Sequence, residues 1–259
     1  MRGTAVVVRA LAAGVLLLFA FGAAAGSALR ARGASRTVRT PKLVGCKPKG
    51  PNLVFHGSMR VRDIALTFDD GPWGQPPSIA FVNELARLHA VGTFFEIGDQ
   101  IHEYDRSGAV ERKMLADGDM IGDHTWTHPD MVTLSPAAQR SQIAGTAGAI
   151  KRATGFQVCL FRAPYGDINS QLLGLVRSMG MTSMQWNNDP RDWSLPGVGS
   201  IERTVLSEAT NGGIVEMHFG GGPRYQTLQA LPTIVSSLRR RGYKFVTLTQ
   251  MLGYRLIYK

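Results

Sequence analysis

The stretch IALTFDDGP at residues 64–72 shows the pattern that repeats along the chain. An apolar run, Ile64–Phe68, leads directly into two aspartates and then into Gly71 and Pro72, which turn the chain sharply. Such a run predicts a buried strand that ends in a polar turn. Similar short apolar or β-branched runs follow at residues 93–97, 120–122, 157–161, 182–186, 214–218 and 244–248.

Helix-like stretches separate most of these runs, at residues 78–89, 135–154, 169–179, 201–210 and 227–241. The second of them begins with Ser135 and Pro136, an N-cap residue followed by proline at the first helical position. Repeated strand–helix units indicate parallel strands. We therefore expect an α/β fold, either a doubly wound sheet or a barrel.

Polar and ionisable residues follow five of the predicted strands at the point where each strand ends. They are Asp69 with Asp70, His124 with His128, residues 162–166, residues 189–193, and His218. An α/β barrel places the carboxyl ends of its strands around one pocket. We expect these residues to share such a pocket.

His124 and His128 are candidate metal ligands. Their spacing of four residues would bring the two imidazoles together on a helical turn. The two histidines and the carboxylate of either Asp69 or Asp70 would make three protein ligands. A metal ion held by three protein ligands keeps one coordination position open for water, which is typical of a catalytic zinc site. Taken singly, the histidines also fit ordinary polar roles, and the two aspartates also fit an acidic turn before a helix.

Composition excludes several classes of protein. With 44% hydrophobic and 19% charged residues, the 259-residue chain is neither disordered nor collagen-like. Its formal charge of +10 comes from 29 basic and 19 acidic residues, but seven of the basic residues and no acidic one precede Leu43. The remaining 22 basic residues against 19 acidic ones leave only +3, so we do not expect a nucleic-acid partner.

The amino end predicts export. Residues 10–29 are uncharged and mostly apolar, about the length that one bilayer crossing needs, and Arg2 and Arg9 precede them. We expect a signal peptide or membrane anchor at residues 1–29, a basic linker at 30–60 and the main domain at 61–259, outside the cytoplasm. A tethered body that faces the cytoplasm is the alternative. If the body is exported, Cys46 and Cys159 could form a disulfide; otherwise they are reduced thiols.

Five motifs occur in order: TFDDGP at 67–72, HTWTH at 124–128, RAPYG at 162–166, DPRDW at 189–193 and IVEMH at 214–218. Together they resemble the motifs of the NodB-type polysaccharide deacetylases, carbohydrate esterase family four, over roughly residues 63–252. This resemblance implies a distorted (β/α) barrel that uses a divalent metal ion to remove N-acetyl, or sometimes O-acetyl, groups from sugars.

The resemblance also implies roles for individual residues. Asp70, His124 and His128 would hold the metal ion, Asp69 would be the general base, and His218 would protonate the leaving amine. We expect zinc, although two imidazoles and a carboxylate also suit cobalt, nickel or iron.

Four further residues match supporting positions of the family. Arg162 would orient the base, Asp192 would steady the acid, the backbone N–H of Tyr165 would donate to the oxyanion, and Trp193 would form a wall of the sugar groove. Singly, the side chains of Arg162, Asp192 and Trp193 also fit core ion pairing or packing.

Glu216 departs from the family, whose members usually carry an aliphatic residue there against the acetyl methyl group. Strand alternation places it on the same face as His218, and a carboxylate in an apolar pocket is costly unless paired or protonated. We expect Glu216 either to raise the His218 pKa or to reshape the acyl pocket, with an internal salt bridge as the alternative. Phe219 is a second departure, at a position where relatives often carry a polar residue.

The sequence therefore predicts an exported or membrane-anchored deacetylase of N-acetylhexosamine polymers, most simply peptidoglycan, with chitin-type oligomers as a further possibility. An O-acetyl xylan esterase and a non-catalytic carbohydrate-binding relative are the alternatives. We expect a monomer that binds polysaccharide and, if the leader is uncleaved, contacts the membrane through residues 10–29.

Overall fold

The computed structural model describes residues 41–259. The expected signal peptide or anchor at 1–29 and the first part of the expected linker lie outside these residues. Within 41–259, no helix is both long enough and apolar enough to cross a membrane.

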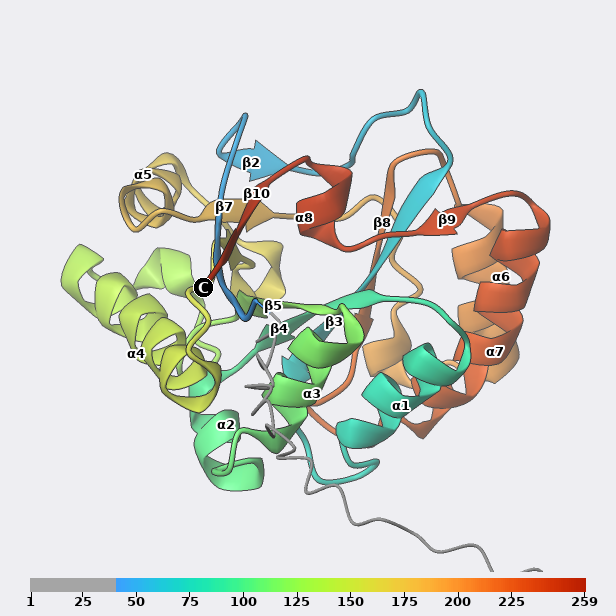
Figure 1. Cartoon of the computed structure of the whole chain (residues 1–259), viewed down its shortest axis with the longest axis horizontal. Helices are drawn as coiled ribbons and strands as arrows, with labels where there is room; N and C mark the ends of the chain where they lie inside the picture. The colour runs from blue at the N-terminus through green and yellow to red at the C-terminus, as the bar shows by residue number, and fades with distance from the viewer. Residues whose placement is uncertain (1–40) are drawn as a thin grey trace, which may run out of the picture. The chain divides into compact units, whose positions relative to one another are not determined.

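The described chain alternates strands and helices (Figure 1). The strands are β1 Leu43–Lys47, β2 Leu53–Val54, β3 Asp63–Gly71, β4 Gly92–Glu96, β5 Met120–Asp123, β6 Leu160–Phe161, β7 Thr182–Met184, β8 Gly213–His218, β9 Lys244–Phe245 and β10 Arg255–Tyr258. The α-helices are α1 Ile79–Arg87, α2 Gly98–Tyr104, α3 Ala109–Asp117, α4 Pro136–Thr154, α5 Ser170–Ser178, α6 Val198–Ser207, α7 Tyr225–Arg240 and α8 Leu248–Met251. Short 3₁₀ turns lie at Met131–Thr133, Pro164–Gly166 and Asp192–Ser194.

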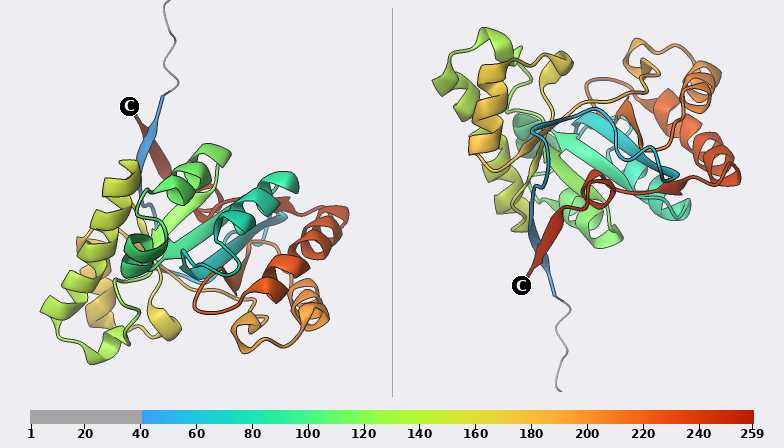
Figure 2. Two further views of the ribbon diagram at one scale, coloured as in Figure 1. Left: turned by 90° about the horizontal axis from the view of Figure 1, so that it is seen from below. Right: turned by 90° about the horizontal axis from the view of Figure 1, so that it is seen from above.

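A curled parallel sheet forms the centre of the fold, in the order β2-β7-β6-β5-β4-β3-β8, with β9 paired to β3. An isolated bridge between Asn188 and Val215 joins the segment after β7 to β8. Figures 1 and 2 show α6 and α7 together at one side of the sheet and α4 at the other. The expected distorted (β/α) barrel is confirmed.

Helix α4 shows why the local signals predicted its ends well. The side chain of Ser135 accepts a hydrogen bond from the backbone N–H of Ala138, and Pro136 occupies the first turn. At the other end Gly155 takes the left-handed conformation, with φ of 80°, which glycine adopts without steric cost. Cap residues at both ends therefore set the bounds of this helix.

An aromatic cluster fills the core between the sheet and α1. The rings of Phe68 and Phe94 stack with centroids 5.0 Å apart, and Phe219 meets Phe94 edge-on at 5.0 Å. Phe219 is fully buried, and a Cβ placed on Gly71 would lie 2.3 Å from its ring. Phe219 therefore packs in the core, which accounts for an apolar residue at this position.

The structure differs from the expected linker in its described part. Strands β1 and β2 lie within residues 43–54: β1 pairs antiparallel with β10 and β2 pairs parallel with β7. Cys46, in β1, forms a disulfide with Cys159, which settles the open question about the two cysteines. Both strands are short and their partner strands lie far along the chain, so no local sequence pattern predicts them.

The last predicted strand, 244–248, is also shorter than expected. Strand β9 ends at Phe245, and the side chain of Thr247 accepts a hydrogen bond from the backbone N–H of Gln250, whose side chain accepts one from the Thr247 N–H. This reciprocal capping box starts helix α8. Helices α2 and α3 were not predicted.

Candidate active site

The carboxyl ends of β3, β5 and β8 open into a cavity of about 540 Å³. Of the ten residues singled out from the sequence, all except Arg162 and Asp192 line this cavity. Those two side chains are fully buried behind it. The structure thus brings the five motifs to one place.

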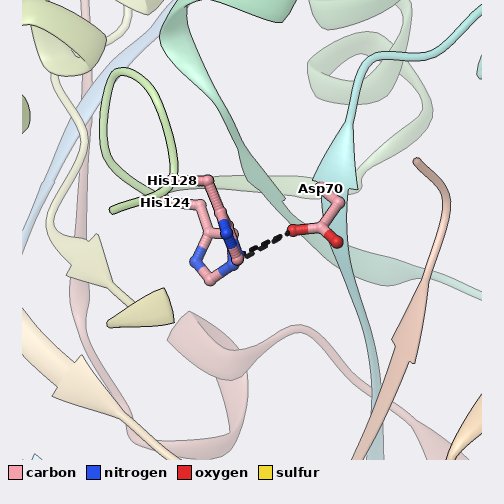
Figure 3. A group of neighbouring side chains, drawn as sticks. All are labelled: Asp70, His124 and His128. Carbon is pink, nitrogen blue, oxygen red and sulfur yellow. Dashed lines mark ion pairs between the residues drawn. The ribbon is translucent and has the colours of Figure 1, made fainter. Parts of the chain in front are cut away.

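Asp70, His124 and His128 all line the cavity, and their side chains point toward one another (Figure 3). Asp70 Oδ1 lies 3.4 Å from His124 Nε2 and 3.2 Å from His128 Nε2, and the three candidate ligand atoms lie within 4.8 Å of one another. Asp70 Oδ1 is buried and receives no hydrogen bond from residues 41–259. An oxygen without a donor beside two imidazole nitrogens fits a divalent metal ion.

The charge state of Asp70 suits the same role. Burial by itself would raise the pKa of Asp70, but its contacts with His124 and His128 and the charge of His218 hold the pKa well below its usual value. The carboxyl group is therefore ionised at neutral pH, as a metal ligand must be.

The two histidines reach this point from a loop, so the expected helical turn at 124–128 is wrong. Thr125 and His128 both have positive φ values, 72° and 58°. The side-chain oxygen of Gln142, in α4, accepts hydrogen bonds from the backbone N–H groups of residues 126 and 127, at 2.8 and 2.9 Å. His124 Nδ1 lies 2.8 Å from the carbonyl oxygen of Arg162, which directs Nε2 toward Asp70.

Asp69 is held by a buried ion pair. Arg162 Nη1 donates to Asp69 Oδ1 at 2.8 Å and to Thr67 Oγ1 at 2.9 Å, and the guanidinium group lies 4.3 Å from the centre of the Phe95 ring. The second oxygen, Oδ2, lies 3.9 Å from His124 Nε2. One oxygen of Asp69 is thus occupied, while the other faces the candidate metal site.

His218 is fixed by Asp192. Its Nδ1 lies 2.7 Å from Asp192 Oδ1, and Asp192 Oδ2 accepts from the His218 backbone N–H at 2.9 Å and from Thr227 Oγ1 at 2.6 Å. Burial alone would lower the pKa of His218, but the charge and hydrogen bond of Asp192, with the carboxylates of Glu216 and Asp70, raise it to about 10. A protonated Nε2 therefore faces the cavity, 4.0 Å from Asp70 Oδ2.

Glu216 lies on the His218 face of β8, as alternation predicted. It is 6% exposed, with Oε1 3.7 Å from His218 Nε2 and Oε2 buried without a hydrogen-bond partner among the described residues. Burial raises the pKa of Glu216 to about 8, against the opposing charge of His218. The role of Glu216 stays a prediction.

The mouth of the cavity is aromatic. Tyr165 is 67% exposed and Trp193 is 46% exposed. The Tyr165 backbone is left-handed, with φ of 61°, and its ring meets that of His128 edge-on at 4.8 Å. Exposed aromatic faces beside a polar centre suit the apolar faces of sugar rings.

Arg224 is a supporting residue that the sequence reading missed. Its buried side chain donates to the carbonyl oxygens of Gly220, Gly221 and Trp193 at 2.8, 3.0 and 3.1 Å. These bonds tie the glycine-rich loop after His218 to the mouth of the cavity. The glycine run at residues 220–222, two residues after the candidate acid His218, was the available signal.

Comparison with known proteins gives one consistent family. A family model described as polysaccharide deacetylase matches residues 56–184. A peptidoglycan-N-acetylglucosamine deacetylase of Bacillus cereus is 35% identical over 195 residues, covering 74% of this chain and 89% of that protein. A chitooligosaccharide deacetylase of Azorhizobium caulinodans is 35% identical over 193 residues, which cover 70% of this chain and 90% of that protein.

A third relative is much longer than the matched region. The peptidoglycan-N-acetylglucosamine deacetylase PgdA of Listeria monocytogenes is 34% identical over 193 residues, which cover 74% of this chain but only 39% of that protein. The chain therefore spans about two fifths of the Listeria protein.

Solved structures agree with this assignment. The structure of the Bc1960 peptidoglycan N-acetylglucosamine deacetylase superposes with a TM-score of 0.74 at 28% identity, covering 78% of this chain and 93% of that one. BA3943 of Bacillus anthracis, described as a CE4 family pseudoenzyme, superposes with a TM-score of 0.71 at 26% identity. The match covers 79% of this chain and 70% of that one.

Proposed function

The chain belongs to the polysaccharide deacetylase family, and from this premise we propose that it is a metal-dependent hydrolase of N-acetylhexosamine polymers. Peptidoglycan is the polymer that we favour, with chitin-type oligomers next, because relatives of both kinds match most of the described chain. The observation that carries the proposal is the convergence of Asp70, His124 and His128 beside Asp69 and His218.

Asp70, His124 and His128 would hold the divalent ion, for which we propose zinc. When bound, such an ion polarises the acyl carbonyl and makes water a better nucleophile at neutral pH. The ionised Asp70 carboxylate and the fixed orientation of His124 support this assignment.

Asp69 would accept the proton of the attacking water. Its free oxygen faces the candidate metal site while Arg162 holds the other. The buried guanidinium group keeps a base in place that would otherwise be costly to bury as an anion.

His218 would donate its Nε2 proton to the leaving nitrogen. Water adds its oxygen to the acyl carbon, the C–N bond breaks, and acetate and a free amine are released. An amine leaves poorly as an anion, so a positioned acid is needed. Asp192 holds His218 in the orientation that presents Nε2 to the cavity. The backbone N–H of Tyr165 would stabilise the oxyanion, and Trp193 would contact the sugar.

We propose that the protein acts outside the cytoplasm, secreted or anchored through residues 1–29, with the catalytic domain following the linker. The disulfide between Cys46 and Cys159 supports this location, because such bonds persist in oxidising compartments. We propose a monomer.

Acetate release tests the function. The full-length protein is treated with a chelator, reloaded with zinc, cobalt, nickel or iron, and assayed on peptidoglycan, chitooligosaccharides and acetylated xylan. We expect release from the N-acetylated substrates that is lost on chelation and restored by metal. Asp70→Asn should lose bound metal, Asp69→Asn should keep metal but lose activity, and the surface variant Asp117→Asn should behave as wild type.

The alternatives predict different results. Release from xylan alone would support the O-acetyl esterase. A metal-loaded protein that releases nothing would support a non-catalytic relative, a class that the similarity to BA3943 makes worth testing.

A further inference from the structure

The cavity has an exposed end and a buried end, and this asymmetry orients any polymeric substrate. Among the residues that line it, Tyr165 and Trp193 are 67% and 46% exposed, whereas Ala163 and Glu216 are 2% and 6% exposed. A sugar chain would lie at the mouth, against the exposed aromatic side chains. If the proposed function holds, the small acyl substituent of the reacting carbonyl therefore points toward the buried end.

Glu216 lies immediately below the reacting groups. In the pairing of β3 with β8, Asp69 is opposite His218 and Thr67 is opposite Glu216. Glu216 is thus one alternation deeper than the candidate base and acid, on the same face of the strand. Of this pair only Glu216 lines the cavity, so an acyl substituent that reaches this depth would meet its carboxyl group.

The Glu216 carboxyl group lacks a complete set of partners. Oε1 lies 3.7 Å from His218 Nε2, while Oε2 is buried and makes no hydrogen bond within residues 41–259. The nearby Arg162 guanidinium group already bonds Asp69, Thr67 and the carbonyl oxygens of residues 184 and 185. Oε1 thus forms with His218 the internal ion pair that the sequence left open, and Oε2 is the oxygen that keeps no partner among residues 41–259.

An unpartnered buried oxygen is costly, and an acetyl methyl group would leave it unpartnered when substrate binds. Burial raises the pKa of Glu216 to about 8, against the opposing charge of His218. A buried carboxyl oxygen accepts a hydrogen bond whether the group is ionised or protonated. A hydroxyl group on the acyl chain can donate that hydrogen bond.

We propose that Glu216 selects acyl groups that carry a hydroxyl on the carbon next to the carbonyl, with N-glycolyl amides as the smallest example. The reaction is the same hydrolysis: water adds to the acyl carbon, the C–N bond breaks, and glycolate is released in place of acetate. No further reactant is needed. The inference rests on the proposed function and adds the class of acyl group.

Competition between two matched oligomers tests this inference. Metal-loaded full-length protein is given chitotetraose in N-acetyl and N-glycolyl forms, and kcat/KM is measured for each. The acetyl form leaves a buried polar group without a hydrogen bond, and this lost bond lowers its kcat/KM. We therefore expect kcat/KM to be about 5- to 100-fold higher for the glycolyl form. Glu216→Leu should remove that preference and raise turnover of the acetyl form, whereas Glu216→Gln, which still forms hydrogen bonds, should retain part of it.

The control is Glu111→Leu, which removes another buried carboxyl group whose oxygens have no hydrogen-bond partner within residues 41–259. Glu111 does not line the cavity. The substitution should leave the ratio unchanged, and thermal melting checks that each variant is folded. A wild-type protein that prefers the acetyl form, or a ratio equal in wild type and Glu216→Leu, overturns the inference while the proposed function stands. If neither oligomer is hydrolysed, the inference and the proposed function are both refuted.

Discussion

The buried carboxyl groups of Glu96 and Glu111 should make the stability of this fold fall as the pH rises. Both side chains are fully buried, at the end of β4 and in α3, and none of their four oxygens has an N–H or O–H donor among the described residues. They contact each other, and Glu111 also contacts Asp105. Burial, reinforced by Asp105, raises the pKa of Glu111 to about 9.

Replacing Glu111 with Gln isolates this effect. The unfolded chain releases the Glu111 proton near pH 4.5, whereas the folded protein keeps it until about pH 9. The stabilisation is therefore complete below the unfolded pKa and is lost as the pH rises toward the folded pKa. The slope is about 1.4 kcal/mol per pH unit for one proton. Because Gln resembles the protonated form and cannot ionise, Glu111→Gln should gain about 3 kcal/mol relative to wild type between pH 6 and 8.

Urea denaturation at pH 6, 7 and 8 and constant ionic strength measures the difference. Glu208→Gln, which changes an exposed glutamate at the end of α6, is the matched control and should run parallel to wild type. A difference between Glu111→Gln and wild type that stays constant across these pH values would refute the reasoning.

Three other substitutions probe the parts of the fold that position the site. Replacing both Cys46 and Cys159 with Ala should lower the free energy of unfolding by about 2–5 kcal/mol, measured by urea denaturation, because their cross-link closes a separation of 113 residues; an unchanged midpoint would contradict this. Gly220→Ala should reduce both bound metal and melting temperature, since its Cβ would collide with the Asp70 carbonyl oxygen. Gly174→Ala in α5 should change neither, because its Cβ would meet no other part of the described chain within 4 Å. Gln142→Ala should weaken metal retention about 10- to 100-fold in a chelator titration, because the loop of the two histidines loses its anchor; equal retention would argue against that role.

Local patterns predicted much of the fold. The burial of β3, β4 and β8 follows from apolar runs, and α4 begins and ends at residues whose capping chemistry is visible in the sequence. The segments that were missed or misassigned depend on distant partners: β1 needs β10, β2 needs β7, and the strand expected through Leu248 stops early because Thr247 caps a helix.

The candidate site divides in the same way. The order of the motifs predicted five site residues: Asp69, Asp70, His124, His128 and His218. Acid–base chemistry and metal binding require particular side chains, and the sequence shows where those side chains occur. The route by which the histidines converge was not visible, since positive φ values and a glutamine from another helix shape their loop.

Residue identity therefore sufficed for the family, the fold class and the chemistry that the site can attempt. Folding alone decided that Cys46 meets Cys159 and that Arg162 donates hydrogen bonds to Asp69 and Thr67. It also decided that one oxygen of Glu216 has no partner within residues 41–259. The reason is physical. Hydrogen bonding, disulfide formation and burial depend on which residues far apart in the sequence come into contact, and those contacts exist only after the sheet has curled.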